Sequence, residues 1–91
     1  METIRKYLPF TTKEDRIDRG VAFAKEIAEK KDKSVYSQHA CKVFVERIEE
    51  CRKLPSGECP YSASDLRNLA DMISPGLGNT VSIWDASELV Q

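Results

Sequence analysis

The segment from Ser34 to Leu54 constrains the fold most, because its apolar residues recur with the period of an α-helix. Ser34 is a residue type that caps helix N-termini, and a helix is expected to end before Pro55. At about 100° per residue, one broad face collects seven residues, Tyr36, Ala40, Val43, Phe44, Ile48, Cys51 and Leu54. Charged residues gather on the opposite side. The segment 34–54 is therefore predicted to be a long amphipathic helix with one buried face.

The segment 12–30 shows the same periodicity. Its apolar stripe consists of Ile17, Val21, Ala24, Ile27 and Ala28. Thr11 and Glu14 have the spacing of a capping box, in which each side chain bonds the backbone N–H of the other. Gly20 lies on the apolar side, where a residue without Cβ favours a close helix crossing. We predict a helix over 12–30 that packs closely on a neighbour near Gly20.

A third helix is predicted at 62–73, after a loop that contains two prolines and a glycine. Ser62 or Ser64 can cap it, and the Ser-Pro-Gly run after Ile73 ends it. Its apolar positions, at helical spacing, are Leu66, Leu69, Ala70 and Ile73.

The segment 79–90 leaves helix, strand and coil open. Asp85 or Ser87 can cap a last helical turn, whereas the run Thr-Val-Ser-Ile-Trp at 80–84 has the composition of a strand. The chain as a whole predicts an all-α fold, a small bundle of three main helices (12–30, 34–54 and 62–73) with an irregular or short-helical tail. Ninety-one residues supply one hydrophobic core, so residues 1–91 are expected to form one domain.

Composition and charge predict a folded cytoplasmic protein that does not enter a membrane. The chain is 32% charged, and no apolar run approaches the roughly 20 residues of a membrane span. The first ten residues lack the apolar stretch of a signal peptide. Three cysteines without a secretion signal favour free thiols, although Cys59 lies within reach of Cys51 across the loop and a bridge between them stays open.

Catalytic and metal-binding patterns are missing from the sequence. His39 is the single histidine, and Cys41 projects to a nearly opposite side of the same predicted helix. There is no C-x-x-C or H-x-x-x-H spacing for a metal. We therefore expect a protein that is not an enzyme, with no catalytic residues, no bound metal and no cofactor.

Part of the tail, Leu-Ala-Asp-Met-Ile at 69–73 followed by Asn-Thr-Val-Ser-Ile-Trp-Asp at 79–85, resembles the helix-turn-helix of phage-repressor-like regulators. The resemblance implies a DNA-binding transcriptional regulator that uses residues 66–88. Two features depart from that family: the spacing is one residue longer, and Ser-Pro-Gly-Leu-Gly replaces the short turn with one glycine. Residues 68–91 also carry three acidic residues and no Lys, Arg or His, which is a poor composition for approaching a polyanion.

The function predicted from the residues is a protein-interaction module, because a helical chain without catalytic chemistry acts by binding. A small inhibitor, adaptor or immunity-type factor that binds a larger protein fits this size and class, and a phage-encoded antagonist of a host machine is one example by analogy. A nucleic-acid partner is the alternative, and a membrane is not expected. The candidate interface residues are Tyr36, Phe44, Arg47 and Trp84.

Arg47 breaks the pattern of the 34–54 helix, since it falls in the middle of the apolar face. Its stem can pack on the core while the guanidinium reaches water or meets Glu14 or Asp18. The sharper interpretation is an interface shared with a partner, for example a homodimer in which two such helices cross. The alternative is a monomer in which other apolar residues cover that surface, namely Ile4, Tyr7, Leu8, Phe10 and Trp84.

Overall fold

The described part of the chain is entirely helical outside its loops. A computed structural model describes residues 12–30 and 34–91. It contains α2 (Lys13–Lys30), α3 (Val35–Arg52), α4 (Ala63–Ile73), the 3-10 turn η1 (Leu77–Asn79) and α5 (Val81–Leu89). No strand occurs within these two ranges. For the described residues the all-α prediction is confirmed, but the predicted count of three main helices is one short, because the tail forms a helix of its own.

Of the four α-helices in the described residues, three are capped at the N-terminus by a hydrogen bond to the side chain of a Ser or Thr. The backbone N–H of Ser37 donates to Ser34 Oγ at 3.0 Å, and that of Asp65 donates to Ser62 Oγ at 3.0 Å. In α2 the cap is Thr12, whose Oγ1 accepts from the Asp15 N–H at 3.0 Å. The predicted box of Thr11 and Glu14 is thus shifted by one residue, and Thr11 itself lies outside the described residues.

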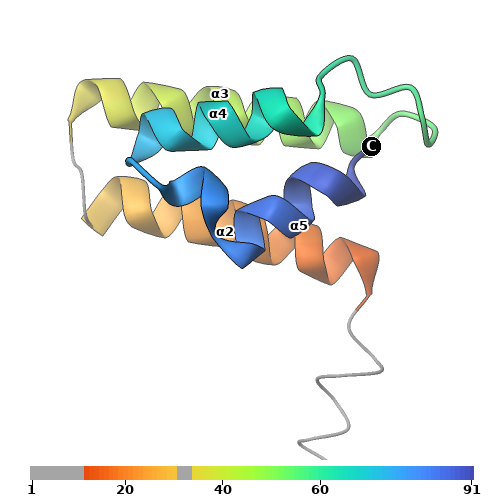
Figure 1. Ribbon diagram of the computed structural model, residues 1–91, viewed down its shortest axis with the longest axis horizontal. Helices are drawn as coiled ribbons and strands as arrows, with labels where there is room; N and C mark the ends of the chain where they lie inside the picture. The colour runs from red at the N-terminus through yellow and green to blue at the C-terminus, as the bar shows by residue number, and fades with distance from the viewer. Residues whose placement is uncertain (1–11, 31–33) are drawn as a thin grey trace, which may run out of the picture.

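The helices form two layers of two (Figure 1). One layer contains α3 and α4, and the other contains α2 and α5; the main contacts are those within each layer. Between the layers lies the core, which includes Ile17, Phe44, Ile48, Leu66, Ile73 and Ile83. The tail is therefore a full structural element, since Ile83 of α5 is as deeply buried as the residues of the longer helices.

The buried face of α3 is turned relative to the predicted one. Ser37 is completely buried and donates from Oγ to the Ile73 carbonyl oxygen at 2.7 Å, which ties α3 to the end of α4. Tyr36 and Leu54, which the periodicity placed on the buried face, are exposed. A serine whose hydroxyl is hydrogen-bonded can be buried in a core. A prediction that counts only apolar residues does not place it there. The face is therefore centred nearer Ser37 and Phe44.

Two glycines set how closely α5 and η1 approach the rest of the bundle. Gly20 faces Ala86 and the Ser82 carbonyl oxygen of α5, which confirms the predicted close crossing. Gly78 of η1 lies against the backbone of Arg67, and its N–H donates to Asp71 Oδ1 at 2.8 Å. The position of α5 is therefore set by a close contact with α2 at Gly20 and, through η1, by a close contact with α4 at Gly78.

The expectation of free thiols is wrong for two of the three cysteines. Cys51 and Cys59 form a disulfide, and Cys41 is a buried free thiol. The loop that follows α3 turns back within eight residues and places the two Cα atoms 4.9 Å apart. The sequence left this bridge open, because whether the two sulfur atoms meet depends on where α3 ends and how tightly the loop reverses.

Candidate protein-binding surface

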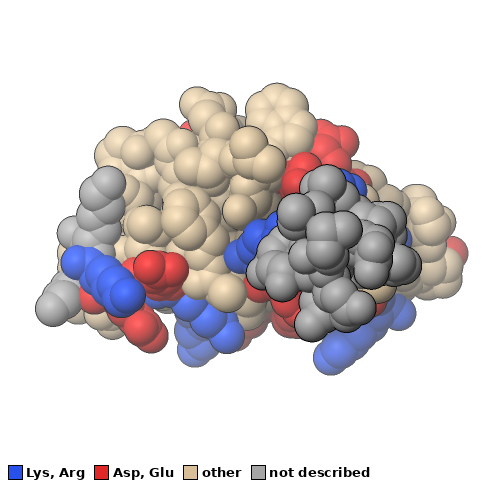
Figure 2. Space-filling model, turned by 90° about the horizontal axis from the view of Figure 1, so that it is seen from below, with Lys and Arg blue, Asp and Glu red and all other residues tan. Residues whose placement is uncertain are grey.

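In the layer of α2 and α5, the large apolar side chains with the highest exposure are those of Val81 and Trp84, in the first half of α5. We define the α5 face as Phe23 and Ile27 of α2 with Pro75, Leu77, Thr80, Val81 and Trp84. Figure 2 shows a broad area without charged side chains over η1 and the first part of α5, bordered by charged side chains. The tail contributes no cation to this area, because no Lys, Arg or His follows Arg67 in the sequence.

Core packing explains why Val81 is left outside. The inner side of α5 carries Ile83, Ala86 and Ser87, which are buried against the other helices. Val81 is the first residue of the helix and points away from that side, with 76% of its surface exposed. The Thr80 hydroxyl, which could have capped the helix, donates instead to the Leu77 carbonyl oxygen at 2.7 Å.

A shallow pocket of about 170 Å³ reaches Thr80, the residue that precedes Val81 in the chain. Its walls come from α2, through Phe23 and Ile27, and from the turn that precedes α5. Phe23 and Ile27 pack against the core and stay partly open to this pocket. The α5 face thus combines an exposed apolar side chain, Val81, with a shallow recess whose walls are partly apolar. Protein partners commonly use such a side chain as an anchor and such a recess as a pocket.

Trp84 is held at the edge of the α5 face by Arg67. The Arg67 guanidinium lies 3.9 Å from the centroid of the indole ring, and its Nη1 donates to Glu88 Oε2 at 3.1 Å. The ring is fixed by this cation–π contact and still 45% exposed. Arg67, which reaches α5 from α4, is therefore already paired with a carboxylate.

Tyr36 and Arg47 lie in the other layer, on α3. Tyr36 is exposed, and the Arg47 guanidinium lies 4.7 Å from the centroid of the Tyr61 ring. The Tyr61 hydroxyl donates to Glu50 Oε1 at 3.1 Å, and this hydrogen bond to a carboxylate raises the pKa of Tyr61. Arg47 is thus engaged with its own chain.

The expected ion pair of Arg47 with Glu14 or Asp18 is made by Arg52 instead. The Arg52 guanidinium lies 2.8 Å from Glu14 and 2.7 Å from Asp18, both on α2. It also lies 3.1 Å from Glu49 on its own helix, α3. The hydrogen bond with Glu14 is the largest of the effects that raise the pKa of Arg52. The residue one turn closer to the end of α3 faces α2, so this cluster joins the two layers.

Phe44 must be corrected as a candidate for an interface, because it is completely buried in the core. It lies at the centre of the inner face of α3, where it packs between the layers. The four predicted residues therefore do not form one surface: Tyr36 and Arg47 are on α3, Trp84 is on α5, and Phe44 is inside.

A groove of about 620 Å³ runs between α2 and α3. Cys41 lies at its floor, and burial raises the pKa of this thiol. His39 is exposed and outside the groove. Within the two described ranges no three His, Cys, Asp or Glu residues are placed to hold a metal, and no helix there is long and apolar enough to cross a membrane.

Sequence reasoning found Trp84 but missed Val81 and its recess. Hydrophobic periodicity predicts which side of a helix or strand is buried. Because the sequence left the element type of 79–90 open, no exposed side could be assigned to this segment. The signal that could have pointed to the surface was the low charge of 68–91, which has no basic residue and only three acidic ones and so predicts a sparsely charged surface where that tail folds. Comparison with protein-family models, curated proteins and solved structures finds no match for this chain.

Proposed function

We propose that this protein is a non-enzymatic interaction module, a small inhibitor, adaptor or immunity-type factor, and that it binds a larger protein through the α5 face. The observation that carries the proposal is the exposed Val81, one helical turn from Trp84, in an area without charged side chains. The neighbouring Thr80 lines a recess to which Phe23 and Ile27 contribute apolar walls. A contiguous apolar area on a small folded protein marks a surface used for binding. Aromatic residues are enriched at the centres of such contacts.

The chemistry of the α5 face favours an apolar protein surface as the occupant. Binding to a nucleic acid draws much of its free energy from phosphate neutralisation by Lys and Arg. Residues 68–91 supply neither, and Arg67 is paired with Glu88. A partner can place an apolar pocket around Val81 and an apolar ridge in the recess. Such a contact excludes water without separating an ion pair or burying an unpaired charge.

Two matched substitutions test the surface. Val81 and Val35 are each the first residue of a helix, and each is strongly exposed, at 76% and 85%. An aspartate at the first helical position suits the helix dipole in both, so Val81→Asp and Val35→Asp add the same charge without opposing the fold. The tagged wild type and both variants are used to capture proteins from an extract of the native host.

We expect one protein at about equal molar amount with the wild type and with Val35→Asp, and its loss with Val81→Asp. A charge placed inside an apolar contact must be desolvated without a partner, whereas one outside it remains in water. Equal capture by all three proteins would contradict the α5 face as the contact surface. Circular dichroism of both variants confirms that each remains helical.

The second candidate is a DNA-binding regulator that uses residues 66–88. The observation in its favour is the order of α4, a turn and α5 within that range. Retention on heparin and a salt-dependent shift of duplex DNA would support it. We expect neither near physiological salt, and tight sequence-specific binding to a duplex would reverse the ranking.

A second copy of this chain is the other protein partner to test. Light scattering distinguishes a monomer of 10.3 kDa from a homodimer at high micromolar concentration. The predicted homodimer through α3 would weaken with Arg47→Glu, whereas a homodimer through the α5 face would weaken with Val81→Asp. The proposal places the protein in the cytoplasm, as the sequence predicts.

A further inference from the structure

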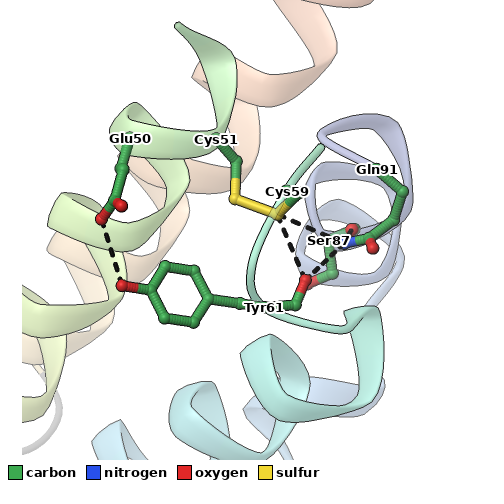
Figure 3. The surroundings of a disulfide bond; sticks show 6 residues. All are labelled: Glu50, Cys51, Cys59, Tyr61, Ser87 and Gln91. Atoms are coloured by element: carbon green, nitrogen blue, oxygen red, sulfur yellow. Dashed lines mark hydrogen bonds between the residues drawn. A yellow bond between two sulfur atoms is a disulfide. The ribbon is translucent and has the colours of Figure 1, made fainter. Parts of the chain in front are cut away.

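The loop between α3 and α4 is bound on both of its sides. On one side the disulfide joins Cys59 to Cys51, in the last turn of α3. On the other side the loop holds Gln91, which follows α5: the Gly57 N–H donates to the Gln91 carbonyl oxygen at 2.8 Å. The side chain of Gln91 donates from Nε2 to the Tyr61 carbonyl oxygen at 3.1 Å (Figure 3).

The disulfide is the strongest of the few links that hold the middle of this loop. Residues 53–58 are exposed, and the Glu58 N–H bonds only within the loop, to the Pro55 carbonyl oxygen at 3.1 Å. Cys51 is almost fully buried, whereas Cys59 is partly open to solvent. Without the bond, the position of Gly57 relative to the core would depend on the weak contacts of an exposed loop.

We propose that Cys51–Cys59 is a site of thiol–disulfide exchange with dithiol reductants, and that its state controls the docking of the end of α5. The inference concerns docking within this chain and is independent of the identity of any partner. The geometry that carries it is the shared loop: the segment fixed by the disulfide is the segment that bonds Gln91.

Cys59 Sγ is the more accessible of the two sulfur atoms, so the exchange begins there. A thiolate of the dithiol attacks Cys59 Sγ, the bond to Cys51 breaks, and Cys51 leaves as a thiolate that takes up a proton. The second thiol of the reagent then attacks the mixed disulfide and releases Cys59, which is also protonated. The reagent is oxidised to its disulfide, and the protein gains two electrons and two protons.

Both states of Cys59 fit the site. The Cys59 sulfur lies 3.2 Å from the Tyr61 carbonyl oxygen, so a thiol formed there has an acceptor for its hydrogen. Reduction removes the covalent link to α3 and lets the loop move away with Gly57. The hydrogen bonds of Gln91 then break more often, and the last turn of α5, with Val90, opens more often.

Amide hydrogen exchange followed by NMR tests the proposal, on the Cys41→Ala background so that only the pair reacts. The protein is compared as isolated and in excess dithiothreitol, with intact mass reporting the uptake of two hydrogen atoms. We expect the amides of Gly57, Val90 and Gln91 to exchange about tenfold faster or more after reduction, while those of α2 are unchanged. Unchanged exchange in the reduced protein would overturn the proposal, and so would equal acceleration throughout α2, which means global unfolding.

Gln91→Ala supplies the matched variant, because it removes the side-chain link and leaves the disulfide intact. If the loop couples the two, reduction accelerates the Val90 amide less in Gln91→Ala than in the parent protein. The same acceleration in both proteins would show that the disulfide and Gln91 act independently, which contradicts control of docking through the loop.

Discussion

Gly20 of α2 lies directly beneath Ala86 of α5, so that a Cβ atom added at Gly20 would stand 2.6 Å from the Ala86 Cβ and 2.7 Å from the Ser82 carbonyl oxygen. Neither neighbour is the flexible end of a side chain, so a larger residue can be accommodated only if α5 shifts. The distance between α2 and α5 is therefore set by the absence of a side chain at one position.

Gly20→Ala is expected to lower the free energy of unfolding by about 1–3 kcal/mol, because overpacking outweighs the gain of up to about 1 kcal/mol that alanine brings to a helix. Ala22→Gly, at an exposed position of the same helix, measures the propensity term alone. Urea unfolding of both variants checks this. A Gly20→Ala protein more stable than wild type would show that α5 is not held at this contact.

Two completely buried serines should respond differently to replacement by alanine. Ser37 Oγ donates to the Ile73 carbonyl oxygen at 2.7 Å, whereas Ser87 Oγ is the one buried side-chain polar atom of the described residues without a hydrogen-bond partner. We expect Ser37→Ala to lower the free energy of unfolding by about 1–2 kcal/mol, and Ser87→Ala to leave it unchanged or raise it by about 1 kcal/mol. Thermal or urea unfolding measures both, and a clear loss in Ser87→Ala would reveal a partner for its hydroxyl.

The Cys41 thiol should make the protein less stable in alkaline solution. Burial raises its pKa, the Glu29 carboxylate adds to this, and Lys25 opposes it. The folded state then holds the proton more tightly than the unfolded state does, so this stability is present below the ordinary thiol pKa of 9.0 and is lost as pH rises above it. Urea unfolding from neutral pH upward should show a steeper alkaline decline for wild type than for Cys41→Ala. Parallel profiles would mean that Cys41 ionises as freely in the folded protein as in the unfolded chain.

Much of the fold could be predicted from the sequence because its signals are local. Ser34 and Ser62 cap helices through bonds to residues three positions away, and the apolar periods of three segments identify three helices. Gly20 predicted a close helix crossing, but the sequence did not indicate that α5 is the helix that crosses there. The buried Ser37 was missed, since its place in the core depends on a carbonyl group 36 residues away.

The candidate site was harder to predict because it depends on contacts between distant residues. Arg47 and Arg52 are both cations near the end of α3, and which of them meets Glu14 is decided by how α3 is rotated against α2. Val81 became exposed only once α5 had formed and directed Ile83 inward. The pairing of Cys51 with Cys59 likewise follows from a loop reversal rather than from the number of cysteines.

The chain contains one tryptophan, Trp84, at the edge of the α5 face, so protein labelled with fluorotryptophan gives a single fluorine NMR signal from the proposed contact surface. Titration with the captured protein, or concentration of the chain alone for self-association, tests the central claim most directly. We expect the Trp84 signal to shift or broaden as the complex forms in wild type and in Val35→Asp, and to stay unchanged in Val81→Asp. A complex that forms with the wild-type Trp84 signal unchanged would contradict binding through the α5 face.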